Sequence, residues 1–181
     1  MKKALLIVDV QNEYFTGKLP ISHPKDSFQN ILRIQKAARE KGILTIVVQN
    51  TILKPNTRTF IRNSKEWQLH DEIIKNGYDV LIEKNYPGSF TGTNLEEVLK
   101  SNNIDTVIIT GFMTQVCCDT TSRQAMHLGY SVEFVSDATG TLDFENSAGK
   151  ASAEELHRSI LVTQQLIFSK VVSTNELLAN I

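Results

Sequence analysis

The sequence TVIITGFMTQVCCDTTSRQAMHLGY, residues 106–130, decides the fold class that we expect. Its first part, Thr106–Thr110, is a short apolar run rich in β-branched residues and followed by Gly111, which predicts a buried strand. A helical pattern then extends over Val116–Leu128 and ends at Gly129. A buried strand, a sharp turn and a helix in this order are typical of an α/β protein.

The same alternation of strand and helix patterns extends along the whole chain. The other predicted strands are Ala4–Val10, Leu44–Gln49, Asp79–Glu83, Ser131–Val135 and Lys170–Ser173, and the other predicted helices are Phe28–Lys41, Lys65–Asn76, Leu95–Asn102, Ser152–Ile167 and Asn175–Ala179. Continuous runs of Val, Ile and Leu indicate strands that are covered on both faces. The sequence therefore predicts a three-layer α/β/α sandwich around a Rossmann-like, mainly parallel sheet of six strands in the order 3-2-1-4-5-6. We expect a single domain over residues 1–181.

Composition restricts the partners and the compartment that we expect. Apolar residues make up 41% and charged residues 22% of the chain, which is ordinary for a globular protein. A net charge of −1 gives no basic excess to drive binding to nucleic acid or to an anionic membrane surface. Asp9 interrupts the first apolar run too early for a signal peptide or a membrane span. The two cysteines are adjacent and have neither a disulfide pattern nor zinc-ligand spacing, so we expect a reduced, cytoplasmic protein.

Cys117 lies on the first turn of the predicted helix. Free backbone N–H groups and the positive end of the helix dipole both favour a thiolate at such a position. Thr114 is a fitting N-cap, whose hydroxyl is expected to accept from the amide of Val116 or Cys117. A buried structural cysteine is the commoner role of any single Cys, so Cys117 indicates chemistry only if it has partners elsewhere.

Two such partners are predicted at the ends of other strands. Asp9 ends the apolar run of the first strand, and in open α/β sheets ligands bind beyond the carboxyl ends of the strands, at the point where strand order reverses. Asp9 and Cys117 are expected to face each other there. Asp9 is then a general base with an adjusted pKa, or alternatively a carboxylate that caps a loop.

Lys84 follows the third predicted strand and supplies a cation, although a solvated lysine is the commoner role of that residue type. The third strand is about 10 Å from the first, so only a long side chain can reach the site. Tyr86 and Phe90, on the loop that follows, are expected to form an apolar wall beside it.

Three segments resemble the signature segments of the isochorismatase-like cysteine hydrolases. They are VDVQN at 8–12, EKNYPGSF at 83–90 and GFMTQVCCDTTSRQA at 111–125, and they come in the family's order and at its approximate spacing. The resemblance spans essentially the whole chain. It implies an Asp–Lys–Cys catalytic triad, which maps onto Asp9, Lys84 and Cys117.

The resemblance also implies a mechanism. Asp9 takes the thiol proton, Lys84 stabilises the charged pair, and Cys117 attacks a carbonyl, usually an amide, to give a thioester that water then hydrolyses. The family carries a non-proline cis peptide ahead of the nucleophile, which here falls at Phe112–Met113. The amides of Met113 and Cys117 would form the oxyanion hole.

Several details separate this chain from other branches of the family. The metal motif of nicotinamidases is an Asp and two His after the second strand, whereas residues 50–70 here hold no Asp and a single His, so we expect no metal and no other cofactor. Isochorismatases proper lack the nucleophilic cysteine and cleave a vinyl ether, which Cys117 argues against. Adjacent helical residues point about 100° apart, so Cys118 is expected to be a buried hydrophobic residue.

The sequence thus predicts a metal-independent hydrolase of a small-molecule amide or of a ureido or carbamoyl C–N bond. Phe15 and Gln115 are further expected pocket residues. The alternative is a catalytically silent protein that keeps the fold and only binds a ligand or acts as a scaffold. The resemblance also implies a homo-oligomer.

Overall fold

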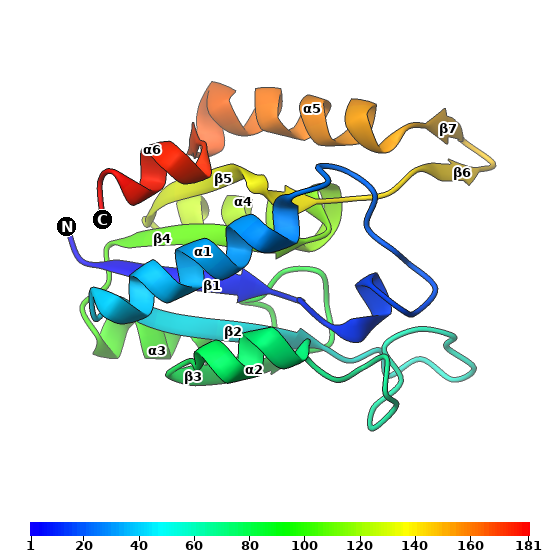
Figure 1. Cartoon of the computed structure of the whole chain (residues 1–181), viewed down its shortest axis with the longest axis horizontal. Coiled ribbons are helices and arrows are strands. Elements are labelled where there is room, and N and C mark those ends of the chain that lie inside the picture. Colours follow the sequence, from blue (N-terminus) through cyan, green and yellow to red (C-terminus); the bar gives the residue numbers. More distant parts are fainter.

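The parallel sheet predicted from the sequence is present in the computed structural model, which describes residues 1–181 (Figure 1). Its strands are β1 (Lys3–Val8), β2 (Leu44–Asn50), β3 (Val80–Lys84), β4 (Thr106–Phe112), β5 (Ser131–Gly140) and β8 (Lys170–Val172). They form a six-stranded sheet in the order β3-β2-β1-β4-β5-β8, and every neighbouring pair is parallel. The order matches the predicted one, with β8 as the sixth strand.

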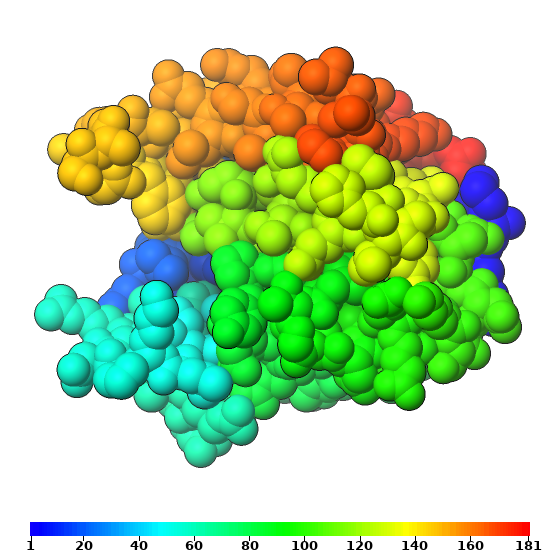
Figure 2. Space-filling view, turned by 180° about the vertical axis from the view of Figure 1, so that it is seen from behind, coloured from blue at the N-terminus to red at the C-terminus, as the bar shows by residue number.

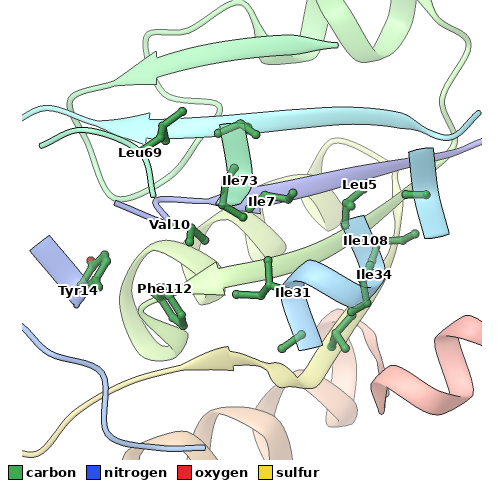
Figure 3. Packing of buried hydrophobic residues seen from close by; sticks show 14 of the residues in the cluster. Leu5, Ile7, Val10, Tyr14, Ile31, Ile34, Leu69, Ile73, Ile108 and Phe112 are labelled. Carbon is green, nitrogen blue, oxygen red and sulfur yellow. The ribbon is translucent and has the colours of Figure 1, made fainter. Parts of the chain in front are cut away.

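Helices cover both faces of this sheet and complete the three layers. One face carries α1 (Ser27–Glu40), α2 (Asp71–Asn76) and α6 (Thr174–Leu178), and the other carries α3 (Leu95–Ser101), α4 (Asp119–His127) and α5 (Ala153–Thr163). Leu5 and Ile7 of β1 pack with Ile31 and Ile34 of α1 on the first face (Figure 3). The residues of β1 that alternate with these point to the opposite face of the sheet and pack into the hydrophobic core on that side. Both sides of β1 are therefore apolar, which is why its sequence is a continuous hydrophobic run.

The structure corrects the predicted start of one helix. The prediction placed a helix over Lys65–Asn76, but α2 begins only at Asp71. In a helix over this segment, the Trp67 carbonyl would accept from an amide of the helix itself. Instead it accepts from the side chains of Gln11 at 2.6 Å and Gln49 at 3.0 Å. His70 caps the true start, because its ring accepts from the amide of Glu72.

The sequence also did not predict a β-hairpin and two π-helical turns. Residues Phe144–Asn146 (β6) and Gly149–Ala151 (β7) form a separate antiparallel hairpin between β5 and α5. The hairpin projects at the end of the molecule where the parallel strands end, whereas the chain termini lie at the opposite end (Figure 1). A π-helical turn, Thr114–Cys118, links β4 to α4, and another, Gln164–Phe168, follows α5.

The surface is hollowed between the hairpin and the segment that follows β2 (Figure 2). This hollow opens at the end of the molecule where the parallel strands end, which is the end at which open α/β sheets bind ligands. None of the helices has the length and apolarity needed to span a membrane.

Gly111, near the end of β4, is expected to be the glycine least tolerant of a side chain. A Cβ atom there would lie 2.0 Å from the carbonyl oxygen of Val8, and the φ angle of +115° is one that L side chains rarely adopt. We expect Gly111→Ala to lower the free energy of unfolding by about 3 kcal/mol or more, through both overpacking and backbone strain.

Urea denaturation measures this effect, and Gly129→Ala is the matched control. Gly129 also has a positive φ, +91°, but a Cβ atom there meets nothing within 4 Å, so only the backbone strain of about 1–2 kcal/mol remains. Equal losses in the two variants would contradict the close approach of β4 to β1.

Candidate active site

Asp9 directly follows β1, at the carboxyl edge of the sheet, and is fully buried. Its φ of +55° turns the chain out of the strand, and its amide still donates to Val48 on β2 at 2.9 Å. One carboxylate oxygen, Oδ2, lies 2.8 Å from the Lys84 ammonium. Apart from this ion pair neither oxygen has a hydrogen-bond partner. Burial raises the pKa of Asp9 above its usual value, although Lys84 opposes the shift. Such a carboxylate is a suitable proton acceptor.

Lys84 is the last residue of β3, and its side chain passes across the end of β2 to the site, as its length led us to expect. The side chain is fully buried. Its ammonium Nζ lies 2.8 Å from Asp9 Oδ2, 3.4 Å from Cys117 Sγ and 3.0 Å from the Tyr86 carbonyl oxygen. Burial alone would lower the pKa of Lys84, but the adjacent Asp9 and Cys117 outweigh it and raise that pKa. Lys84 is therefore a fixed cation between the other two groups.

Cys117 lies in the π-helical turn ahead of α4 and is only 4% exposed. The surroundings of the thiol oppose the thiolate that a helix start favours. Burial and the neighbouring Asp9 carboxylate raise the pKa of Cys117, and Lys84 offsets only part of this. Burial and Asp9 thus favour the protonated form of Cys117. Cys118 is fully buried in the core beneath α3 and α4, as expected of a hydrophobic residue.

The turn before the nucleophile differs from the predicted N-cap. The Thr114 hydroxyl does not accept from the helix amides. Instead the Met113 carbonyl accepts from the amides of Val116 and Cys118, both at 3.2 Å, and Thr114 contacts His157. The Phe112–Met113 peptide bond is cis. The amide of Met113, a buried residue, donates to no acceptor in the structure.

The four expected pocket residues lie in different surroundings. Phe15 packs edge-to-face on Phe112, the residue before Met113, with ring centroids 6.0 Å apart. Gln115 follows Thr114, and its side-chain oxygen is buried without a partner. Tyr86 is 59% exposed, and it is its backbone carbonyl that contacts Lys84.

The Phe90 ring lies elsewhere. It stacks on Tyr130 with ring centroids 6.1 Å apart. Tyr130 precedes the amino end of β5, whereas Cys117 follows the carboxyl end of β4. In this position the Phe90 ring packs against the hydrophobic core on the face of the sheet that α4 covers, and it anchors its loop there.

Two residues that support the site were missed in the sequence. The Gln11 side chain donates to the Asn50 carbonyl at 3.0 Å and accepts from the Asn50 amide at 2.8 Å, so it fixes the end of β2. The Asn50 side-chain oxygen in turn contacts the Lys84 ammonium at 3.4 Å. A signal was available, because Gln11 is only two residues beyond Asp9 and would share its edge of the sheet.

Comparison with known proteins shows the family of this chain. Residues 3–176 match the isochorismatase domain. The chain belongs to the isochorismatase family. This family member is 36% identical over 179 residues to the isochorismatase family protein YrdC of Bacillus subtilis, with 98% of this chain and 95% of that protein covered. The crystal structure of a protein from Burkholderia xenovorans LB400 superposes with a TM-score of 0.94 at 44% identity, covering 98% of this chain and 86% of that one.

Some relatives of this isochorismatase-family chain carry names that state an activity. N-carbamoylsarcosine amidase of an Arthrobacter species is 31% identical, over 71% of this chain and 56% of the relative. Ureidoacrylate amidohydrolase RutB of Agrobacterium fabrum is 28% identical, over 84% of this chain and 82% of the relative. The crystal structure of a cysteine hydrolase from Pseudomonas syringae superposes with a TM-score of 0.83 at 26% identity, covering 98% of this chain and 91% of that one. The present chain is thus a hydrolase of this family.

Proposed function

We propose that this protein hydrolyses the C–N bond of a small-molecule amide, or of a ureido or carbamoyl compound, through a thioester on Cys117. The observation that carries the proposal is the contact chain from Asp9 through Lys84 to Cys117, with distances of 2.8 Å and 3.4 Å and all three side chains buried. Relatives named as amidases and amidohydrolases support the C–N bond as the target.

Proton transfer from Cys117 to Asp9 begins the proposed reaction. As the thiol proton moves to Asp9, Sγ attacks the substrate carbonyl carbon and the carbonyl oxygen becomes an oxyanion. Lys84 stays charged throughout and compensates the negative charge that moves from carboxylate to sulfur. The raised pKa of Cys117 is consistent with removal of its proton by Asp9 during the attack.

The second half returns the enzyme to its resting state. Asp9 gives its proton to the leaving nitrogen, ammonia or an amine departs, and a thioester remains on Cys117. Asp9 then takes a proton from a water that attacks the thioester, and this proton returns to sulfur as the acid product leaves. The unpaired Met113 amide and the amide of Cys117 are the proposed donors to the oxyanion.

The surroundings of the site support a small substrate. Cys117 and Met113 are almost completely buried, so a small molecule reaches the thiol more easily than a protein chain does. Gln115 offers a buried oxygen without a partner, which suits an N–H group of an amide or ureido substrate. Phe15 and Tyr86 are the proposed apolar walls. The homo-oligomer that the resemblance implies stays a prediction.

Ammonia release from a panel of small amides, ureido acids and carbamoyl amino acids tests the proposal. We expect steady turnover of at least one class by the wild-type protein, without added metal. The matched control is Cys117→Ala, which removes the nucleophile and little volume. Turnover that Cys117→Ala retains would contradict the covalent mechanism, and no turnover across the panel would favour the silent binding protein instead.

A further inference from the structure

His157, on α5, contacts the nucleophile turn but belongs to neither the triad nor the proposed oxyanion hole. Its side chain is 4% exposed and has two hydrogen-bond partners. The Nε2 atom lies 2.8 Å from the Ser136 carbonyl oxygen, and the Nδ1 atom lies 2.9 Å from the Thr114 hydroxyl. The ring therefore connects β5 to the turn that carries Cys117.

The partners determine where the imidazole proton lies. A backbone carbonyl can only accept, so Nε2 carries the hydrogen and donates to Ser136. In the neutral ring Nδ1 is then an acceptor, and the Thr114 hydroxyl donates to it. Burial lowers the pKa of His157 to about 4, which keeps the ring neutral at pH 7. The titratable groups that face it are His23, whose ring centroid is 5.4 Å away, and Asp137.

Thr114 is the point at which this contact reaches the site. Its side chain is fully buried, it directly follows Met113 with its unpaired amide, and it lies three residues before Cys117. Because its hydroxyl proton is directed to His157, the side chain is held in one rotamer. The far side of the contact is also fixed, since the Ser136 hydroxyl donates to the Val172 carbonyl on β8 at 3.2 Å.

We propose that His157 is a positioning residue that holds Thr114 and thereby the Met113 amide in the geometry that receives the oxyanion. The inference rests on the proposed function, because holding the turn in place matters for catalysis only if an oxyanion forms there. It predicts that the acceptor atom at the Nδ1 position matters for catalysis, whereas the donor at Nε2 matters mainly for anchoring.

A pair of substitutions separates these two atoms. Asparagine places an amide oxygen near the Nδ1 position and can still accept from Thr114, whereas glutamine reaches the Nε2 position and leaves the Thr114 hydroxyl without its acceptor. We expect His157→Gln to lower kcat about tenfold to a hundredfold with little change in KM, as a displaced oxyanion donor would. We expect the kcat of His157→Asn to stay within about threefold of the wild-type kcat.

Thr114→Val provides the matching change on the other partner. It keeps the shape and removes the hydroxyl, so it should lower kcat as His157→Gln does, and the double variant should be no worse than either single one. Circular dichroism and urea denaturation verify that each variant is folded. Equal losses of kcat in His157→Asn and His157→Gln, or no loss in any variant, would overturn the positioning role.

A second readout needs no substrate and separates this inference from the proposed function. A small aliphatic aldehyde such as propionaldehyde adds to the Cys117 thiol as a hemithioacetal, whose oxygen occupies the oxyanion position, and protects the thiol from iodoacetamide. The protecting concentration should rise about tenfold or more in His157→Gln and Thr114→Val, but not in His157→Asn. If the wild-type protein hydrolyses no amide, the proposed function fails, yet this pattern still supports or overturns the role of His157.

Discussion

Replacing Cys117 with alanine is expected to abolish turnover, with kcat lowered by about 10⁴-fold or more, the size of effect seen when a covalent nucleophile is removed. No other group can take its place. Asp9 and Lys84 are held against each other at 2.8 Å, and the neighbouring Cys118 lies in the core beneath α3 and α4. Ammonia release under saturating substrate measures the effect.

Cys118→Ala is the matched control for this variant. It removes the same atom from the adjacent position, so any general effect of losing a buried sulfur appears in both variants. We expect it to retain activity within about threefold and to lose about 1 kcal/mol of stability from the small cavity. Loss of activity in Cys118→Ala, with Cys117→Ala still active, would mean that the nucleophile has been assigned to the wrong cysteine.

Lys84→Met is expected to produce the largest loss of stability together with loss of activity. The substitution leaves the Asp9 carboxylate buried without its cation, which lies 2.8 Å from Oδ2. Removing one member of a buried pair costs about 3–5 kcal/mol. Without the cation, the pKa of Asp9 should also rise further, and the carboxylate should become protonated at neutral pH.

The double variant Asp9→Asn/Lys84→Met tests the origin of that cost. It removes both charges, so we expect urea denaturation to recover most of the stability that Lys84→Met loses, whereas activity stays absent. A double variant as unstable as Lys84→Met would mean that lost packing of the lysine chain, and not the uncompensated charge, causes the effect.

The sheet could be predicted from the sequence because its strands are continuous apolar runs. Each residue of β1 from Ala4 to Val8 packs into one of two cores, so its pattern has few alternatives. Lys84 could be predicted for a geometric reason, since only a long side chain reaches from β3 to the site. The boundaries of α2 could not be predicted, because contacts between residues distant in sequence decide them. The side chains of Gln11 and Gln49 bind the Trp67 carbonyl.

Two features of the site were beyond local sequence reasoning. Thr114 has the residue type of an N-cap, yet its hydroxyl bonds to His157, which is 43 residues away in the chain. The Cys117 thiol lies at a helix start, which favours a thiolate, but burial of the site and the Asp9 carboxylate raise its pKa. Both depend on the environment that the tertiary fold creates.

The central claim is that Cys117 forms a thioester during turnover. Acid-quenched intact-mass spectrometry of the protein, taken within the first turnovers of a substrate from the amide panel, tests it most directly. We expect an added mass equal to the substrate minus its ammonia or amine, located on Cys117 by peptide mapping and absent from Cys117→Ala. Turnover without any adduct, or an adduct on another residue, would contradict it.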